Sequence, residues 1–345
     1  MDEVKALVKD KTFFIITCIT TILALLVIVL GAYVRLSHAG LGCPDWPGCY
    51  GQLVMPLDKA EAESIEHEYT DRPVEHAKAW KEMVHRYAAG TLGLLILYLA
   101  VVCWKDRKHK NRPVIVTTLL LLLVVFQALL GMWTVTLLLK PVIVLGHLLG
   151  GMTILCLLFW LLLRQIGHAE IKTVNPSFRQ LIFIALAAVV LQICLGGWTS
   201  SNYAALACPD FPTCQGTWWP GMDFKEGFTM WRGLGVDYEG GVLTGQARTA
   251  IHMSHRLGAV LVLLIVGTVA ILAIRNKNRH VSRTGKILFA LLCVQLGLGV
   301  TNVMHFLPLP VAVAHNGTAA LLLLCLLTLV HYAVPMNSNN GEPRG

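Results

Sequence analysis

Eight long apolar stretches constrain this chain more than any other feature. In lipid every backbone polar group must be satisfied within the protein, and one continuous apolar run of about 20 residues achieves this as a membrane-spanning helix. The chain has 345 residues, of which 55% are hydrophobic and 14% charged. We therefore predict an all-α integral membrane protein with eight transmembrane helices, at about 12–36, 84–104, 114–138, 142–163, 179–198, 250–274, 286–306 and 311–334.

The N-terminal apolar run is long and has no clear small-residue cleavage site. A secretory signal peptide has a shorter apolar region that ends at such a site. We therefore expect the first run to be an anchored helix rather than a cleaved signal.

Membrane topology accounts for the net charge of +8. Lys and Arg gather in the N-terminal segment and near 105–112, 164–179 and 275–286. Cytoplasmic loops carry such an excess, so we expect these loops and both termini in the cytoplasm of a bacterial cytoplasmic (inner) membrane, and no nucleic-acid partner. The long segments 37–83 and 199–249 then lie on the outer, periplasmic side.

The two halves of the chain repeat each other. Because several ordered motifs recur at nearly one spacing, one structural unit is used twice. Each half has an even number of helices, which predicts a parallel repeat of two pseudo-symmetric four-helix bundles. We assign 1–164 to the N-terminal half, 165–178 to a cytoplasmic linker and 179–345 to the C-terminal half. The matches are L-G-A-Y-V-R at 30–35 with L-G-G-W-T-S at 195–200, C-P-D-W-P-G-C at 43–49 with C-P-D-F-P-T-C at 208–214, and Q-A-L-L-G at 127–131 with Q-L-G-L-G at 295–299.

Four histidines occupy matching places in the two halves: His85 and His147 in the first, His255 and His315 in the second. We expect all four one to two turns below the outer surface, with His85 at the start of its helix. Ionisable residues inside membrane spans default to function, and two histidines facing each other across a bundle hold a haem iron from both sides. The sequence thus predicts two haem sites, with haem iron as the metal, because neutral imidazole suits iron and none of the four has the set of cysteine or carboxylate partners expected of a zinc site.

The halves differ at one position beside these histidines. Glu82 stands three residues before His85, where His252 precedes His255. The spacing places Glu82 on the same helix face as His85, where a carboxylate accepts a proton or stabilises a developing cation. A helix N-terminal acid favoured by the macrodipole is the alternative. On the catalytic interpretation the first half reacts and the second holds a permanent haem.

Two cysteine pairs, Cys43 with Cys49 and Cys208 with Cys214, lie in the outer segments, each with two prolines between its members. Prolines bend the segment and the outer compartment is oxidising, so we expect two disulfides, with metal binding by the thiols as the weaker alternative. The second pair is interpreted as a loop staple, whereas for the first a redox-active dithiol stays open.

Three arginines lie near the predicted haem sites. Arg86 and Arg256 directly follow His85 and His255, and Arg35 stands at the outer end of the first helix. Guanidinium groups pair with carboxylates such as haem propionates, and snorkelling to the interface accounts for them equally well.

Together these residues resemble the haem A synthase family over about 14–334. The most specific parts are E-M-V-H-R-Y at 82–87, G-L-G-C-P-D-W-P-G-C at 40–49 and the duplicated histidines. The resemblance implies eight helices in two pseudo-symmetric bundles, and oxidation of the C8 methyl of haem O to the formyl of haem A by two hydroxylations and loss of water. It assigns the substrate haem to His85 and His147, the essential acid to Glu82, a cofactor haem B to His255 and His315, and the family's outer cysteine pair, which some members lack, to Cys43 and Cys49.

The resemblance also implies haem O and membrane lipid as binding partners. Contacts with haem O synthase and with cytochrome oxidase assembly factors are expected, together with an electron acceptor that the sequence does not identify. A di-haem b-type electron-transfer subunit that oxidises quinol explains the four histidines equally well but gives the Glu82/His252 difference no role. A transporter with parallel repeats needs paired helix breaks near the midplane, which we do not find.

Overall fold

The computed structural model describes residues 2–54, 75–108, 112–166, 175–233 and 235–334. Within these ranges the chain is helical, with no strand and only two isolated β-bridges. Eight of the helices are long and apolar enough to cross a membrane, which confirms the predicted number. Their bounds are α1 Asp2–Leu36, α3 His76–Lys105, α4 Val114–Thr136, α5 Pro141–Ile166, α6 Pro176–Ser201, α8 Gly245–Ile274, α9 Arg279–Met304 and α10 Leu309–Ala333, and α7 is a single turn at Phe224–Gly227.

Four helices, α1, α3, α8 and α9, begin at least five residues earlier than their apolar runs indicate. α3 starts at His76 and α8 at Gly245. His85 therefore lies nine residues inside its helix, whereas the sequence predicts it at the helix start. The prediction was wrong because it took the first apolar residue as the start, whereas a helix also continues through a polar turn. At α8 a cap marks the true start, since the Thr244 side chain accepts a hydrogen bond from the Ala247 backbone N–H.

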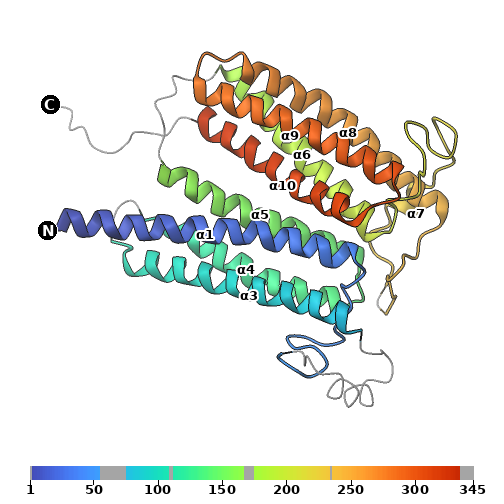
Figure 1. Cartoon of the computed structure of the whole chain (residues 1–345), viewed down its shortest axis with the longest axis horizontal. Coiled ribbons are helices and arrows are strands. Elements are labelled where there is room, and N and C mark those ends of the chain that lie inside the picture. The colour runs from blue at the N-terminus through green and yellow to red at the C-terminus, as the bar shows by residue number, and fades with distance from the viewer. Residues whose placement is uncertain (1, 55–74, 109–111, 167–174, 234, 335–345) are drawn as a thin grey trace.

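Each half closes into a ring of four helices (Figure 1). In the first half α1 and α4 each contact both α3 and α5; in the second half α6 and α9 each contact both α8 and α10. The halves meet where α1 contacts α10 and where α5 contacts α6 and α10. A buried apolar core runs through both rings, with Leu155 and Leu158 from the first half and Val266 and Leu326 from the second.

The loops that follow α1 and α6 fold alike in backbone detail. Both contain a cis proline, at Trp46–Pro47 and Phe211–Pro212. Left-handed residues recur at matching places, as do the bridges Cys49–Gln52 and Cys214–Thr217. These loops, together with the segment up to α8, lie at one end of the helices, which we call the loop end (Figure 1). α1 begins and α10 ends at the opposite end.

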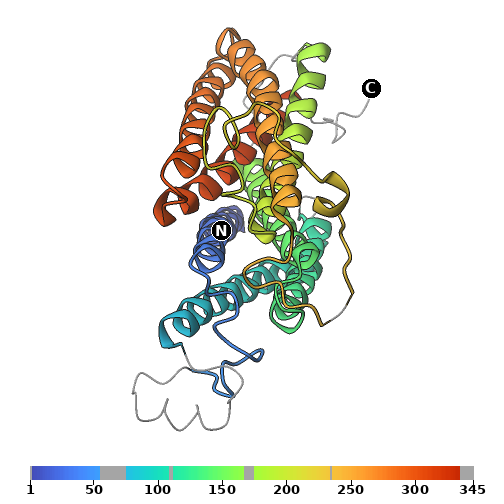
Figure 2. The same cartoon turned by 90° about the vertical axis from the view of Figure 1, so that its right-hand side faces the viewer.

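One segment of the second half reaches over the first. Residues 229–233 and 235–243, which we call the strap, run from α7 to the turn between α4 and α5 (Figure 2). The Lys140 side chain, 1% exposed, donates a hydrogen bond to the Gly233 carbonyl at 2.6 Å and lies 3.1 Å from the ring centre of Trp231. The backbone N–H of Tyr238 donates to the Leu138 carbonyl at 3.1 Å.

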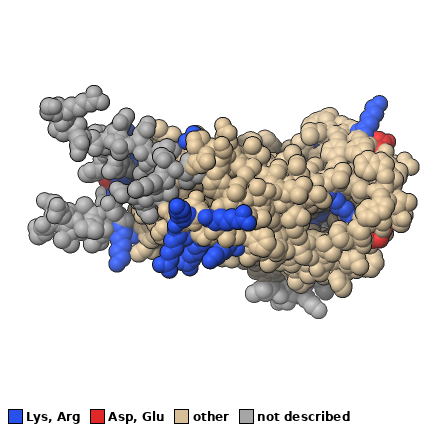
Figure 3. Space-filling view, turned by 90° about the horizontal axis from the view of Figure 1, so that it is seen from above, with Lys and Arg blue, Asp and Glu red and all other residues tan. Residues whose placement is uncertain are grey.

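Basic side chains are unevenly distributed along the helices. In Figure 3 most of the blue Lys and Arg atoms gather toward the end opposite the loop end. A band of surface without charged residues separates them from the loop end. This is the pattern on which the positive-inside rule depends. The cytoplasmic placement of that end stays a prediction.

Candidate functional site

The first histidine pair comes together between α3 and α5. The ring centres of His85 and His147 are 6.5 Å apart, and the ring planes are inclined by 67°. Two imidazoles that bind one metal through nitrogen–metal bonds of about 2.0–2.1 Å have ring centres roughly 6 Å apart. The observed separation therefore matches two ligands on opposite sides of a single metal ion.

Each of the four histidines packs against a glycine of a neighbouring helix. A Cβ atom added at the glycine would lie only 2.9–3.4 Å from the imidazole ring. Any larger side chain at these positions would push the ring away. The pairs are His85 with Gly31, His147 with Gly131, His255 with Gly196 and His315 with Gly299. The four rings thus share one packing arrangement, repeated in both halves.

The donor set fits a haem iron. All four rings are half-buried, and the Nδ1 atoms of His147 and His315 are buried with no hydrogen-bond partner in the part of the chain that the structure describes. A buried imidazole nitrogen without a partner is costly unless something else satisfies it, and an iron does so. No group of three or more His, Cys, Asp or Glu side chains converges within the described ranges, so the two imidazoles of the first pair fit a metal that brings its other ligands with it, as a haem iron does.

Glu82 lies one turn before His85 and is 5% exposed. One carboxylate oxygen accepts a hydrogen bond from the Cys43 backbone N–H at 3.0 Å, and the other pairs with Arg86. In the second half His252, 4% exposed, occupies the matching place, and its Nδ1 lies 3.0 Å from the Ala204 carbonyl. The same position therefore carries a buried carboxylate in one half and a buried imidazole in the other.

The arginines that follow the histidines hold the cysteine loops. Arg86 donates to carbonyls of Asp45, Pro47 and Gly48. Arg256 donates in the same way to carbonyls of Cys208, Asp210 and Thr213. These contacts bind the loops to α3 and α8, and contact with a propionate stays a prediction for both side chains.

Arg35 joins the two halves. It donates to the Ser200 carbonyl at 2.8 Å, and its guanidinium lies 4.3 Å from the ring centre of Tyr203. His38 stacks on the same tyrosine, with ring centres 6.1 Å apart. The Arg35 Nε is buried and has no partner among the described residues, so this atom is available to a ligand group such as the predicted propionate.

Both cysteine pairs form disulfides, Cys43–Cys49 and Cys208–Cys214. Within each loop an aspartate caps the backbone: Asp45 accepts from the N–H groups of Tyr50 and Gly51, and Asp210 from those of Gln215 and Gly216. The hydrogen bond from Thr213, with those from the loop backbone, holds the pKa of Asp210 below its usual value. Each loop is thus closed by its own disulfide and bound to the early turns of a helix. That helix is α3, which carries Glu82, for the first loop and α8, which carries His252, for the second.

Sequence reasoning missed three glutamines beside the histidines. Gln192 and Gln295 contact His255 and His315, and Gln127 lies in the first half at the position that matches Gln295. Gln127 and Gln295 open the repeated motifs at 127–131 and 295–299, so a signal was present. Polar residues inside apolar runs point to function in membrane helices.

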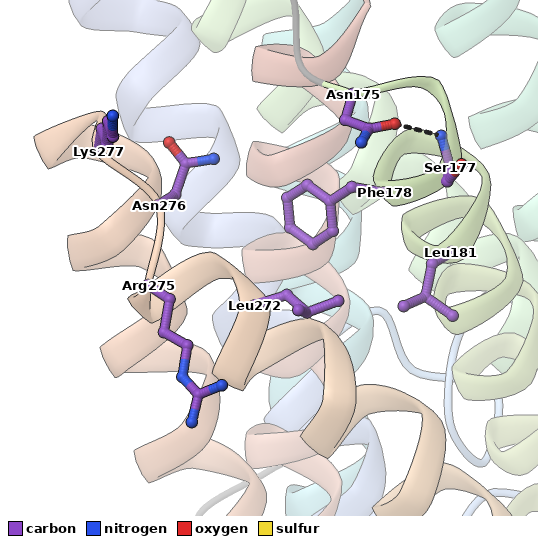
Figure 4. A pocket seen from close by; sticks show the side chains of 8 residues that line it. All are labelled: Asn175, Ser177, Phe178, Leu181, Leu272, Arg275, Asn276 and Lys277. Atoms are coloured by element: carbon purple, nitrogen blue, oxygen red, sulfur yellow. Dashed lines mark hydrogen bonds between the residues drawn. The ribbon is translucent and has the colours of Figure 1, made fainter.

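A separate pocket lies at the far end of the second half, between the start of α6 and the end of α8 (Figure 4). Phe178, Leu181 and Leu272 form its apolar side, and Arg275 and Lys277 stand at its margin. None of its lining residues belongs to the histidine sites.

Comparison with known proteins places this geometry in a family. Residues 14–327 match the family described as cytochrome oxidase assembly protein. A haem A synthase of Shewanella oneidensis is 43% identical over 330 residues, which cover 94% of this chain and 97% of the relative. The chain belongs to the haem A synthase family. Haem A synthases of Halalkalibacterium halodurans, 26% identical over 93% of this chain and 96% of the relative, and of Chelativorans sp., 28% identical over 89% and 86%, also match.

Membership of the haem A synthase family confirms the resemblance inferred from the sequence. It makes this chain an enzyme of the oxidoreductase class that takes part in haem A synthesis. The matched region contains both histidine pairs, Glu82 and both cysteine loops.

Proposed function

We propose that this protein oxidises the C8 methyl group of haem O to the formyl group of haem A. The observation that carries the proposal is a difference in charge between the two sites: a buried carboxylate, Glu82, beside the first histidine pair and an imidazole, His252, beside the second. Only the first site has a carboxylate there, a group that accepts a proton and also stabilises the cation that develops as the methyl group is oxidised. The N-terminal half is therefore the reacting half.

His85 and His147 are the proposed ligands of the substrate haem. With both axial positions taken by imidazole, dioxygen has no place on the substrate iron. Water is then the source of oxygen: each hydroxylation removes electrons from the porphyrin, adds water at the methyl carbon and releases protons. Glu82 accepts the proton or stabilises the cation at the methyl carbon, and loss of water from the second product, a gem-diol, leaves the formyl group.

His255 and His315 are the proposed ligands of a resident haem B. A haem held by two imidazoles supplies one-electron transfer between the substrate site and an outside electron acceptor. The unpartnered Nδ1 of His315 and the glycines packed against both rings support this assignment. His252, whose Nδ1 contacts the Ala204 carbonyl, binds the second loop to α8 and leaves no carboxylate beside this site.

We also propose a bacterial inner-membrane location, with the loop end toward the periplasm and both termini in the cytoplasm. Its support is the gathering of basic residues at the opposite end (Figure 3). A farnesylated haem can then enter from the lipid between the helices. Haem O synthase and cytochrome oxidase assembly factors are the proposed partners for receiving substrate and passing on product.

A di-haem electron-transfer subunit is the competing function, and the haem content separates the two. The full chain is expressed in cells that supply haem O, and extracted haems are identified by mass. We expect haem A to form and haem B to be retained. Haem B at both sites with no haem A would instead establish the electron-transfer function. A variant with His85→Ala serves as the matched control, because it removes a substrate ligand and should abolish haem A while haem B remains.

A further inference from the structure

The histidines of the two halves differ in what touches their rings. In the second half the Gln192 amide nitrogen donates to His255 Nδ1 at 3.0 Å, and the Gln295 amide nitrogen to His315 Nε2 at 3.2 Å. Gln192 also donates to the His255 carbonyl at 2.9 Å. Both histidines of this half therefore have a glutamine side chain within hydrogen-bond distance.

The first half lacks these contacts. Val27 stands where the second half has Gln192, and His85 interacts with the backbone of Val27. Gln127 matches Gln295, but its amide nitrogen is buried without a partner, and His147 Nδ1 is also unpartnered, counting the described residues only. His147 interacts with the Gln127 backbone instead. Neither ring of the first half is held by a side-chain hydrogen bond in that part of the chain.

Helix packing makes room for one of these glutamines. A Cβ atom added at Gly258 would lie 2.2 Å from the Gln192 side-chain oxygen, so the glutamine fits only because α8 has a glycine there. Counting from the histidines, Ala88 occupies this position in α3. A glutamine at position 27 would meet the Ala88 methyl group. The first half thus has two apolar side chains, Val27 and Ala88, at the positions where the second half has Gln192 and Gly258.

The side-chain oxygens of Gln192 and Gln295 are buried and have no partner among the described residues. An imidazole that binds a metal through one nitrogen carries a proton on the other and donates it to an acceptor. Turning the Gln295 amide by half a rotation presents its oxygen to that N–H group, and the same turn at Gln192 exchanges the hydrogen bond to the His255 carbonyl for one from the imidazole N–H. The two unpartnered oxygens are thus the acceptors that a pair of metal-bound imidazoles requires.

We propose that Gln192 and Gln295 are positioning residues that hold His255 and His315 as ligands of a permanently bound haem, and that the first half lacks such contacts so that its haem can leave. The inference rests on the proposed function and deepens it. An enzyme that keeps one haem and releases another needs two sites of unequal retention, and outer hydrogen bonds to ligand histidines typically change metal affinity by about 10- to 100-fold.

Gln192→Met and Gln295→Met test the first part, because methionine keeps the length of the side chain and removes the amide. The full-length protein is purified in detergent, and its retained haem B and midpoint reduction potential are measured. We expect haem affinity to fall roughly 10- to 100-fold and the potential of the remaining haem to rise, because the imidazole loses electron density. Gln192→Glu should retain the haem and lower its potential. Gln165→Met is the matched control, because Gln165 contacts Thr17 and Leu161 and, among the described residues, no histidine.

Wild-type haem content and potential in both methionine variants would overturn the inference, as would a potential that moves in the same direction for methionine and glutamate. Wild-type protein that holds no haem at all would instead overturn the proposed function. A reciprocal variant, Val27→Gln with Ala88→Gly, installs the amide in the first half. We expect slower transfer of its haem to excess apomyoglobin, and an unchanged transfer rate would contradict the second part.

Discussion

At the scale of single residues, Glu82 and His252 show how one position can separate two equal sites. Both side chains are buried and both reach the backbone of a neighbouring loop, one through Cys43 and the other through Ala204. Only the glutamate places a carboxylate in the same helix as its histidine, in the site proposed to react. The sequence predicted this difference because the repeat aligned the two positions. It did not predict the loop carbonyls that Arg86 and Arg256 contact, since those depend on loop conformation.

Replacing Glu82 with glutamine tests its role. Glu82→Gln keeps the shape of the side chain and the contact with the Cys43 N–H but removes the proton acceptor. We expect haem to remain bound while haem A output falls about 100-fold or more, with haem O or its hydroxylated form accumulating in extracts analysed by mass. Glu75→Gln, at the exposed start of α3, is the matched control and should behave as wild type. Normal haem A output from Glu82→Gln would remove Glu82 from the mechanism.

At the scale of helices, glycines decide how closely a neighbour approaches each histidine. The apolar runs predicted every membrane helix but not the starts of α1, α3, α8 and α9, because their first turns are polar. The histidine–glycine contacts could not be predicted either. Predicting these contacts requires knowing which helices are neighbours. A glycine in an apolar run does not indicate which side chain of another helix will pack against it.

Adding a methyl group at Gly31 tests this packing. The new Cβ would lie 2.9 Å from His85 Nε2, so the ring must move. We expect Gly31→Ala to lower conversion of haem O by up to about 100-fold, as small misplacements of reacting groups do, while retained haem B is unchanged. Gly90→Ala is the control, because nothing lies within 4 Å of its added Cβ. Equal conversion by the two variants would show that the Gly31 contact does not position His85.

At the scale of the whole molecule, two similar rings are joined in an asymmetric way. The halves share helix contacts and loop conformations. The sequence repeat predicted two matching four-helix halves, and the matching backbone of the loops is a further finding. The strap was not anticipated. Lys140 holds it, and the repeat position of Lys140 is Pro308, so no duplicated signal marks the contact.

The orientation of the whole molecule can be measured by cysteine labelling. Lys225→Cys lies in α7 at the loop end and Lys277→Cys follows α8 at the opposite end, and both positions are exposed. A membrane-impermeant maleimide applied to intact spheroplasts should label position 225 only, and position 277 should react after permeabilisation, because the positive-inside rule puts that end in the cytoplasm. The wild-type chain controls for native thiols. Labelling of 277 in intact spheroplasts would reverse the proposed topology.

The strap also sets an order of events during biosynthesis. Lys140 and Leu138 belong to the part of the chain that leaves the ribosome first, yet their partners Gly233 and Tyr238 are made about 95 residues later. At roughly 5–20 residues per second of synthesis, the turn between α4 and α5 stays uncovered for several seconds. The N-terminal half therefore finishes folding after α6 has been inserted, and a truncated first half would leave the ammonium group of Lys140 without the Gly233 carbonyl and the Trp231 ring.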